Sequence, residues 1–483
     1  MTQSKWIGRA LSLALCTAAL AACQQGTSNQ DSNASAQGSE ISLDRKAEKD
    51  LREAIAQAPA HGLKPELFLK GGEEGQDLVQ AGLKYASALA NGYTDPTKLH
   101  EVYTIPRPKT DVRAGLQKAM QEGKVAEWLN SLAPQTDEYR ALSQAFVKYG
   151  KLAGQSPQQR IPADKPIKPG ARDPRIPAIV AVLRSGGYVP EQQQGAADPV
   201  VYTPALVAAV KQYQADSGTK PDGVLGKETI GMLSTGPAQR ARQLAVAMER
   251  LRWLRRDPPG TRIDVNTASS MLDYWRDGQH VDRRKVVTGA ADKPTPQIQA
   301  PLFRLVAKPS WRVPQGIGIK ELATKGQAWL RENQYVMKDG KYVQEPGPKN
   351  SLGLVKFDMQ DDQQIYLHDT PAKEAFALSD RHRSHGCVRV ENAIQFATAL
   401  ATQQGIAAQF QKAMQGEEDE VFVKLPKPIP VRLFYQTAFW DGSRIQFRPD
   451  VYGWDENIAK ALELAPGEPQ KIDQPESSDD IGP

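Results

Sequence analysis

Two histidines and one cysteine stand in an order that nucleophilic catalysis could use. His368 ends an apolar run, and His385 precedes Cys387 with only Gly386 between them. A cysteine attacks as its thiolate, which a nearby imidazole can supply by taking the proton or by pairing with the anion. His385 and Cys387 are two residues apart, so in an extended chain they point to the same face. Backbone N–H groups around Gly386 and Cys387 could then form an oxyanion hole.

The cysteine count favours a chemical role for Cys387. The other two cysteines, Cys16 and Cys23, fall in an N-terminal segment that we expect to be processed. The folded part then holds a single thiol, which cannot form an internal disulfide. An unpaired cysteine in an exported protein is more readily explained by reactivity than by packing.

The surrounding sequence resembles the signature of the L,D-transpeptidase catalytic domain. The motif is His368-Asp369-Thr370 followed by Ser384-His385-Gly386-Cys387-Val388-Arg389-Val390. Further matching stretches, similar to the larger Gram-negative-type members, are residues 346–353, Lys356-Phe357, residues 366–371 and Pro309-x-Trp311-x-Val313-Pro314. The resemblance covers about residues 45 to 455.

The resemblance implies a reaction and a role for each motif residue. Cys387 would attack the carbonyl of the third residue of a tetrapeptide stem and expel the terminal D-alanine, while His368 takes and returns the proton. The amine of another stem would then accept the acyl group and form a 3→3 cross-link, with no cofactor. His385 and Gly386 would shape the thiolate site and oxyanion hole. The predicted substrate-binding residues are Ser384, Arg389 and Tyr366.

Three other interpretations fit parts of the motif. A zinc site could use His382, His385, Cys387 and His368, although paired Cys-x-x-Cys spacing is missing. The same acyl-enzyme could be opened by water, which would make the protein an L,D-carboxypeptidase or endopeptidase. A non-catalytic wall-binding lipoprotein would require an idle cysteine. Papain-like peptidases fit less well, because their cysteine precedes the histidine.

The composition suits a globular protein of about three domains. The chain has 483 residues, of which 40% are hydrophobic and 24% charged, enough for a sizeable core. The formal net charge is +5, without a dense basic stripe interleaved with aromatic residues. Nucleic acid is therefore not an expected partner.

The N-terminus has the pattern of an export signal. Lys5 and Arg9 precede an apolar stretch too short to span a bilayer stably, and Leu20-Ala21-Ala22-Cys23 resembles a bacterial lipobox. We expect residues 1–22 to be removed, Cys23 to carry the lipid, and residues 23–42 to form a flexible tether. Gln24 favours the outer membrane, with the protein on the periplasmic side. A plain cleaved signal is the alternative.

Two helical regions should precede the catalytic part. Residues 43–160 show helical spacing, as at Leu51 and Ile55, and the 129–155 stretch predicts two helices in a structural or docking subdomain. The proline-containing residues 161–174 predict a linker. Residues 175–240 resemble the three-helix peptidoglycan-binding domain, with Thr229 as the N-cap of its last helix. Peptidoglycan stem peptides and glycan strands are the implied partners.

Residues 242–455 should form a mainly β catalytic domain in a multidomain α+β protein. Short runs such as Arg262–Asn266 alternate, and Asp277-Gly278 is a hairpin signal. Many short strands predict a sandwich or partly open barrel, with one helix from 392 to 404. Residues 320–345 stand where the family carries a substrate-covering cap. The acidic residues 466–483 predict a disordered tail.

Overall fold

The computed structural model describes residues 41–155, 160–190, 198–467 and 482. The predicted signal, the lipidation site Cys23 and almost all of the predicted tether and tail lie outside these residues. Within them, no helix combines the length and apolar character needed to cross a membrane.

The first region is helical, as predicted. Asp44 begins the first helix by accepting the Ala47 N–H at 2.7 Å. Leu51 and Ile55 are fully buried on one face of that helix, in line with their spacing. The elements are α1 (Arg45–Ala56), η1 (Ala58–His61), η2 (Pro65–Leu67), α2 (Gly75–Asn91), α3 (Pro96–Leu99), α4 (Val112–Gln121), α5 (Val125–Leu132) and α6 (Asp137–Gln155).

The second region contains α7 (Ile176–Ser185), α8 (Pro204–Asp216) and α9 (Lys227–Leu233). Ile167, in the segment predicted as a linker, pairs with Leu225 and is buried with these helices. The N-cap prediction for Thr229 is wrong. Gly226 caps α9, and Thr229 lies inside the helix, where its hydroxyl accepts a hydrogen bond from Gln214 at 3.2 Å. Thr229 therefore helps to hold the turn before α9.

Helix α10 (Pro237–Trp253) was not expected, because residues from 242 onward were predicted to be mainly β. It packs along α6 and is buried on nearly all sides. Arg250 and Arg252 are both buried in it. A helix buried all round shows no amphipathic stripe, which is why its sequence did not reveal it.

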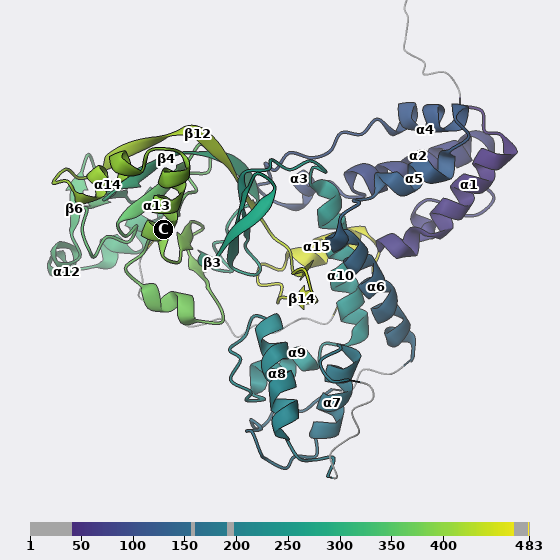
Figure 1. The fold of residues 1–483 in the computed structure, drawn as a ribbon, viewed down its shortest axis with the longest axis horizontal. Helices are drawn as coiled ribbons and strands as arrows, with labels where there is room; N and C mark the ends of the chain where they lie inside the picture. The colour runs from purple at the N-terminus through teal and green to yellow at the C-terminus, as the bar shows by residue number, and fades with distance from the viewer. Residues whose placement is uncertain (1–40, 156–159, 191–197, 468–481, 483) are drawn as a thin grey trace, which may run out of the picture. The chain divides into compact units, whose positions relative to one another are not determined.

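The catalytic region is built on a closed, barrel-like sheet (Figure 1). The strand order is β3-β11-β9-β8-β4-β12-β1-β2, and β2 pairs back with β3, while β10 adds to β3. The strands are β1 (Arg262–Asn266), β2 (Met271–Arg276), β3 (Gln279–Gly289), β4 (Ile298–Ala307), β8 (Val355–Met359), β9 (Leu367–His368), β10 (His382–Ser384), β11 (Val388–Val390) and β12 (Val421–Phe434).

The closure differs from the predicted sandwich or partly open barrel. Asp277 and Gly278 both have positive φ, 50° and 83°, as a type I′ turn requires. This tight hairpin pairs β2 with β3 and so joins the two ends of the sheet. Helices α13 (Ala393–Gln403) and α14 (Ala407–Gln415) pack on the barrel core, and α13 confirms the predicted helix.

A small second sheet lies in residues 311–345, which are called the cap segment below; the role of residues 320–345 in covering substrate stays a prediction. Its order is β5-β7-β6, and it has its own apolar cluster around Trp311, Leu322 and Leu330. The cap elements are β5 (Trp311–Arg312), α11 (Gln315–Lys320), η3 (Leu322–Thr324), α12 (Gln327–Glu332), β6 (Tyr335–Lys338) and β7 (Lys341–Gln344).

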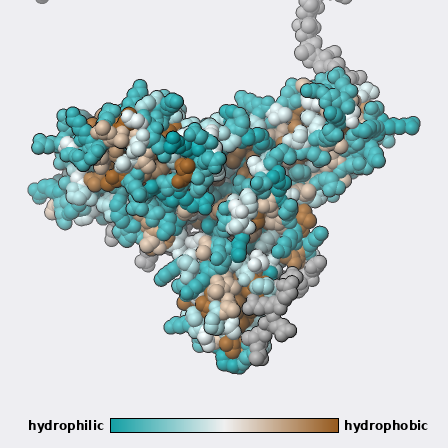
Figure 2. All heavy atoms as spheres, viewed as in Figure 1, coloured by the Kyte–Doolittle hydropathy of each residue, from teal (hydrophilic) through white to brown (hydrophobic). Residues whose placement is uncertain are grey.

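The chain after β12 adds β13 (Ala438–Trp440), β14 (Ile445–Phe447) and α15 (Trp454–Ala461). Helix α15 contacts α10, so the last elements rest on the unexpected helix. Hydrophilic residues cover most of the face drawn in Figure 2, consistent with the apolar clusters lying inside.

Candidate active site

Strand register brings the predicted nucleophile and base together. Strands β9 and β11 run parallel, and Arg389 pairs with His368. Two residues earlier, the same register sets Cys387 opposite Tyr366. Alternate residues share a face, so all four side chains project from the same side of the sheet. Strand spacing places the Cα atoms of His368 and Cys387 about 8 Å apart, close enough for their side chains to meet.

The Cys387 thiol is buried, with 6% of the residue exposed. Its Sγ lies 3.9 Å from the carbonyl oxygen of Gln364. Burial raises the pKa of the Cys387 thiol to about 11, although hydrogen bonding from Tyr366 and the charge of Lys356 pull it down. At neutral pH the resting thiol is therefore protonated.

The His368 ring is fully buried and held in one orientation. Its Nδ1 lies 2.5 Å from the carbonyl oxygen of Asp369, and only an N–H can donate to that oxygen. Nε2 is then the unprotonated nitrogen, and it has no hydrogen-bond partner among the described residues. Burial lowers the pKa of His368 well below its usual value, and the charge of Arg389 adds to this. The ring is a neutral base with an open acceptor.

Hydrogen bonds made by its own residues hold the loop before Cys387 in place. The Ser384 hydroxyl donates to the Cys387 carbonyl at 2.6 Å and accepts the Gly386 N–H at 3.2 Å. Gly386 has φ +116°, which side chains rarely allow, and its carbonyl accepts from Thr295 at 2.8 Å. Since Ser384 already binds the Gly386 N–H, the Cys387 N–H is the better oxyanion donor. Substrate binding by Ser384 stays a prediction.

Arg389 lies beside the base rather than at the surface, with 1% of the residue exposed. Gly482 packs against it, and a Cβ at Gly482 would come within 2.6 Å of the Arg389 guanidinium. Across the sheet, Lys356 pairs with His368, and its ammonium lies 4.3 Å from the Tyr366 ring centre. Substrate binding by Arg389 and Tyr366 also stays a prediction, in a setting of positive charge that would suit a carboxylate.

Comparison with protein families gives three matches along the chain. Residues 260–414 match the model of the L,D-transpeptidase catalytic domain. Residues 172–233 match a peptidoglycan binding domain, and residues 42–146 match a domain described as a scaffold.

The individual relatives are distant in sequence. A Haemophilus influenzae protein, provisionally named an L,D-transpeptidase, is 29% identical over 239 residues, which are 45% of this chain. The chain spans about half, 48%, of that relative's length. Solved L,D-transpeptidases from Xylanimonas cellulosilytica and Stackebrandtia nassauensis are 15% and 14% identical. Each match covers 56% of this chain. It covers 99% of the Xylanimonas chain and 94% of the Stackebrandtia chain, with TM-scores of 0.21 and 0.25. Scores this low carry no argument about the fold.

Two charged residues that the sequence analysis missed meet His385. The His385 Nε2 lies 2.5 Å from the carboxylate of Glu321 and 2.6 Å from the ammonium of Lys293. Glu321 and Lys293 are themselves 3.0 Å apart. They precede His385 by 64 and 92 residues, so no spacing in the sequence connected them to the motif.

The zinc alternative loses one of its ligands. Both nitrogens of His382 are occupied, by the Asp380 carboxylate at 2.7 Å and the Thr267 carbonyl at 2.9 Å. Among the described residues, no group of three His, Cys, Asp or Glu side chains could hold a metal ion. Nucleophilic catalysis by Cys387 with His368 as base stays the prediction that this geometry allows.

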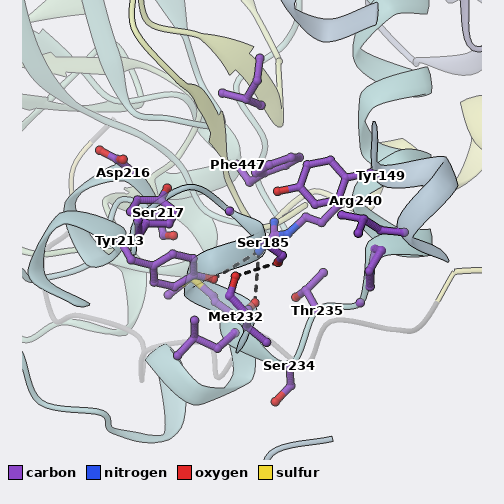
Figure 3. A pocket seen from close by; sticks show the side chains of 18 of the residues that line it. Tyr149, Ser185, Tyr213, Asp216, Ser217, Met232, Ser234, Thr235, Arg240 and Phe447 are labelled. Carbon is purple, nitrogen blue, oxygen red and sulfur yellow. Dashed lines mark hydrogen bonds between the residues drawn. The ribbon is translucent and has the colours of Figure 1, made fainter. Parts of the chain in front are cut away.

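A hollow of about 440 Å³ lies where α6, the α7–α9 region and the β13–β14 hairpin meet (Figure 3). Aromatic rings line it, and Tyr149 meets Phe447 edge to face at 5.8 Å between ring centres. The Arg240 guanidinium lies 4.3 Å from the centre of the Phe447 ring. The hollow borders the peptidoglycan-binding region and lies outside the strands that carry Cys387 and His368.

Proposed function

We propose that the protein is a peptidoglycan L,D-transpeptidase that forms 3→3 cross-links through an acyl-enzyme on Cys387. One observation carries the proposal. A buried thiol and a neutral imidazole with an open Nε2 project from neighbouring strands, on one face of an L,D-transpeptidase domain. The match of residues 172–233 to a peptidoglycan binding domain supports peptidoglycan as the polymer on which the catalytic domain acts.

The first half-reaction would release D-alanine. As Sγ of Cys387 attacks the carbonyl of the third stem residue, its proton passes to Nε2 of His368. The Cys387 N–H, at the loop that Ser384 holds, donates to the developing oxyanion. When the tetrahedral intermediate collapses, the C–N bond breaks and the leaving amine takes the proton from His368. A thioester on Cys387 and a neutral imidazole remain.

The second half-reaction would reverse these roles. The side-chain amine of an acceptor stem attacks the thioester and loses a proton to His368. The C–S bond then breaks, and the sulfur recovers the proton. Because both groups are neutral at rest, proton transfer accompanies each attack and no ion pair is needed beforehand.

Hydrolysis of the same thioester is the competing function. Water is smaller than a stem peptide and is always present. Transfer of the acyl group to an amine therefore requires that the site exclude water from the thioester. The 6% exposure of Cys387 favours transfer over hydrolysis.

Anchoring at the periplasmic face of a membrane completes the proposal. The lipobox-like Leu20-Ala21-Ala22-Cys23 supports lipidation of Cys23 after export. Incorporation of labelled palmitate by the full chain, lost on Cys23→Ala, is the expected result. Equal labelling of the two proteins would remove the anchor from the proposal.

The reaction is tested with a disaccharide tetrapeptide and mass analysis of the products. The wild-type protein should release D-alanine and form dimers, whereas Cys387→Ala should do neither. Cys387→Ser keeps the size of the side chain with a weaker nucleophile and should retain little activity. Tripeptide without dimer would instead identify a hydrolase, and full activity of Cys387→Ala would overturn the mechanism.

A further inference from the structure

The cap segment and the catalytic loop meet at one charged contact. Glu321 connects α11 to η3 within the cap, and His385 belongs to the loop that ends at Cys387. Lys293, from the loop after β3, completes the contact. A carboxylate, an ammonium and an imidazole are therefore in mutual contact, and each comes from a different segment of the catalytic region.

The cap side of this contact is rigidly mounted. Leu322, next to Glu321, is fully buried in the cap's own apolar cluster, which also includes Trp311 and Leu330. Glu321 therefore cannot move far from the cap body. A hydrogen bond or ion pair to the Glu321 carboxylate therefore holds the whole cap segment in position.

The cap also reaches the nucleophile through Tyr366. The Tyr366 ring packs against both the barrel core and the cap cluster, and register places it opposite Cys387. Since only 6% of Cys387 is exposed, a stem peptide cannot reach the sulfur while this packing is closed. Movement of the cap away from the loop would therefore loosen the packing around Tyr366 and, through it, around Cys387.

We propose that Glu321 is a positioning residue that latches the cap segment over Cys387 through His385 and Lys293. The inference rests on the proposed function and adds a role to it. The closed latch keeps water from the thioester during the interval between departure of D-alanine and entry of the acceptor stem, and so limits hydrolysis. Opening the latch admits stem peptides.

The ionisation of the contact fits a latch that is closed at neutral pH. Burial opposes the charge of Glu321, but hydrogen bonds from His385 and Lys293 outweigh it and hold the pKa of this carboxyl below its usual value. The ionisable groups beside it are Lys293 and His385 on the barrel side and Lys320 on its own segment. Glutamine in place of Glu321 would keep the size of the side chain but remove the charge that strengthens these hydrogen bonds.

Hydrogen exchange and product analysis test the latch on the full chain. Glu321→Gln should speed amide exchange in residues 311–345 about tenfold, in line with loss of one charge-assisted bond. It should also raise the ratio of tripeptide to 3→3 dimer severalfold. Lys293→Gln breaks the same contact from the other side and should shift both readouts in the same direction.

Glu345→Gln is the matched control. Glu345 pairs with Lys338 at 3.4 Å, both lie in the cap, and neither meets the catalytic loop. Exchange and product ratio in Glu321→Gln and Lys293→Gln that equal those of Glu345→Gln would overturn the latch. The exchange readout needs no turnover, so an inactive wild type would defeat the proposed function without deciding the latch.

Discussion

Two buried ionisable side chains, Glu249 in α10 and His368 in the active site, differ in whether their hydrogen-bonding atoms have partners. In α10, Glu249 is fully buried, and its two carboxylate oxygens accept bonds from Thr94, Trp253 and Arg252. Arg252 in turn donates to the Tyr139 hydroxyl at 2.8 Å. In the active site, the Nε2 of the equally buried His368 has no such partner in the described part of the chain.

The difference separates structure from chemistry. A buried charge whose lone pairs and protons are all matched fixes neighbouring segments and has nothing left to give a substrate. A buried base with one open acceptor stores the cost of its missing bond and can recover it by taking a proton. The first kind of site should respond to mutation in stability, and the second in rate.

Replacement of His368 should have the largest effect, and on rate alone. Asparagine can still donate to the Asp369 carbonyl but cannot accept a proton, so His368→Asn should lower kcat/KM about a thousandfold. Steady-state release of D-alanine measures this. Unfolding in urea should show a much smaller change than any substitution at Glu249, and a variant that kept near-normal turnover would show that His368 is not the base.

Replacement of Glu249 should act in the opposite way. Glu249→Gln leaves the buried Arg252 without its counter-charge, which should cost about 3–5 kcal/mol of unfolding free energy. Specific activity per folded molecule should hardly change. Glu122→Gln, in an exposed pair with Lys118, is the control, and its cost should stay under about 0.5 kcal/mol. Equal costs for the two variants would remove the distinction between the regions.

Acid should destabilise the protein through its buried histidines. Burial lowers the pKa of His100 to about 3 and of His61 to about 4, below the usual 6.5. The unfolded chain therefore binds more protons below pH 6.5, and stability falls from there toward the folded-state values. Each such group contributes about 1.4 kcal/mol per pH unit.

His100 offers the clean test, because its ring lies among aromatic side chains and neither nitrogen finds a hydrogen-bond partner in the described chain. His100→Phe should reduce the slope of unfolding free energy against pH, between 6 and 4, by about one proton. An unchanged slope would mean that His100 is not held neutral in the folded protein.

Alkylation of Cys387 should change gradually with pH. With a thiol pKa of about 11, the rate with iodoacetamide should rise about tenfold per pH unit from 7 to 10. A reactive thiolate would instead level off near neutral pH. A plateau below pH 8 would contradict the neutral resting pair.

Much of this arrangement could be predicted from sequence, because its signals are local. The strand predicted at Arg262–Asn266 is β1, although all five of its residues are buried, and the helix predicted from 392 to 404 is α13. The same holds for the His368 and Cys387 motif, whose strands pair side by side. The α+β class with a helical first region is confirmed.

The misses share one physical cause, which is long-range contact. Helix α10 carries charges that only partners such as Thr94 and Tyr139 make tolerable inside the protein. Glu321 and Lys293 look like ordinary surface charges until folding brings them to His385. Barrel closure likewise depends on which strands meet, and periodicity carries no information about that.

Intact-mass analysis of the acyl-enzyme tests the central idea most directly. A tetrapeptide donor with its side-chain amine acetylated can acylate the protein but cannot accept. The wild type should gain the mass of the donor minus D-alanine, mapped to Cys387, while His368→Asn should gain it far more slowly. An adduct on another residue, or equal rates in the two proteins, would contradict a thiol that His368 deprotonates as it attacks.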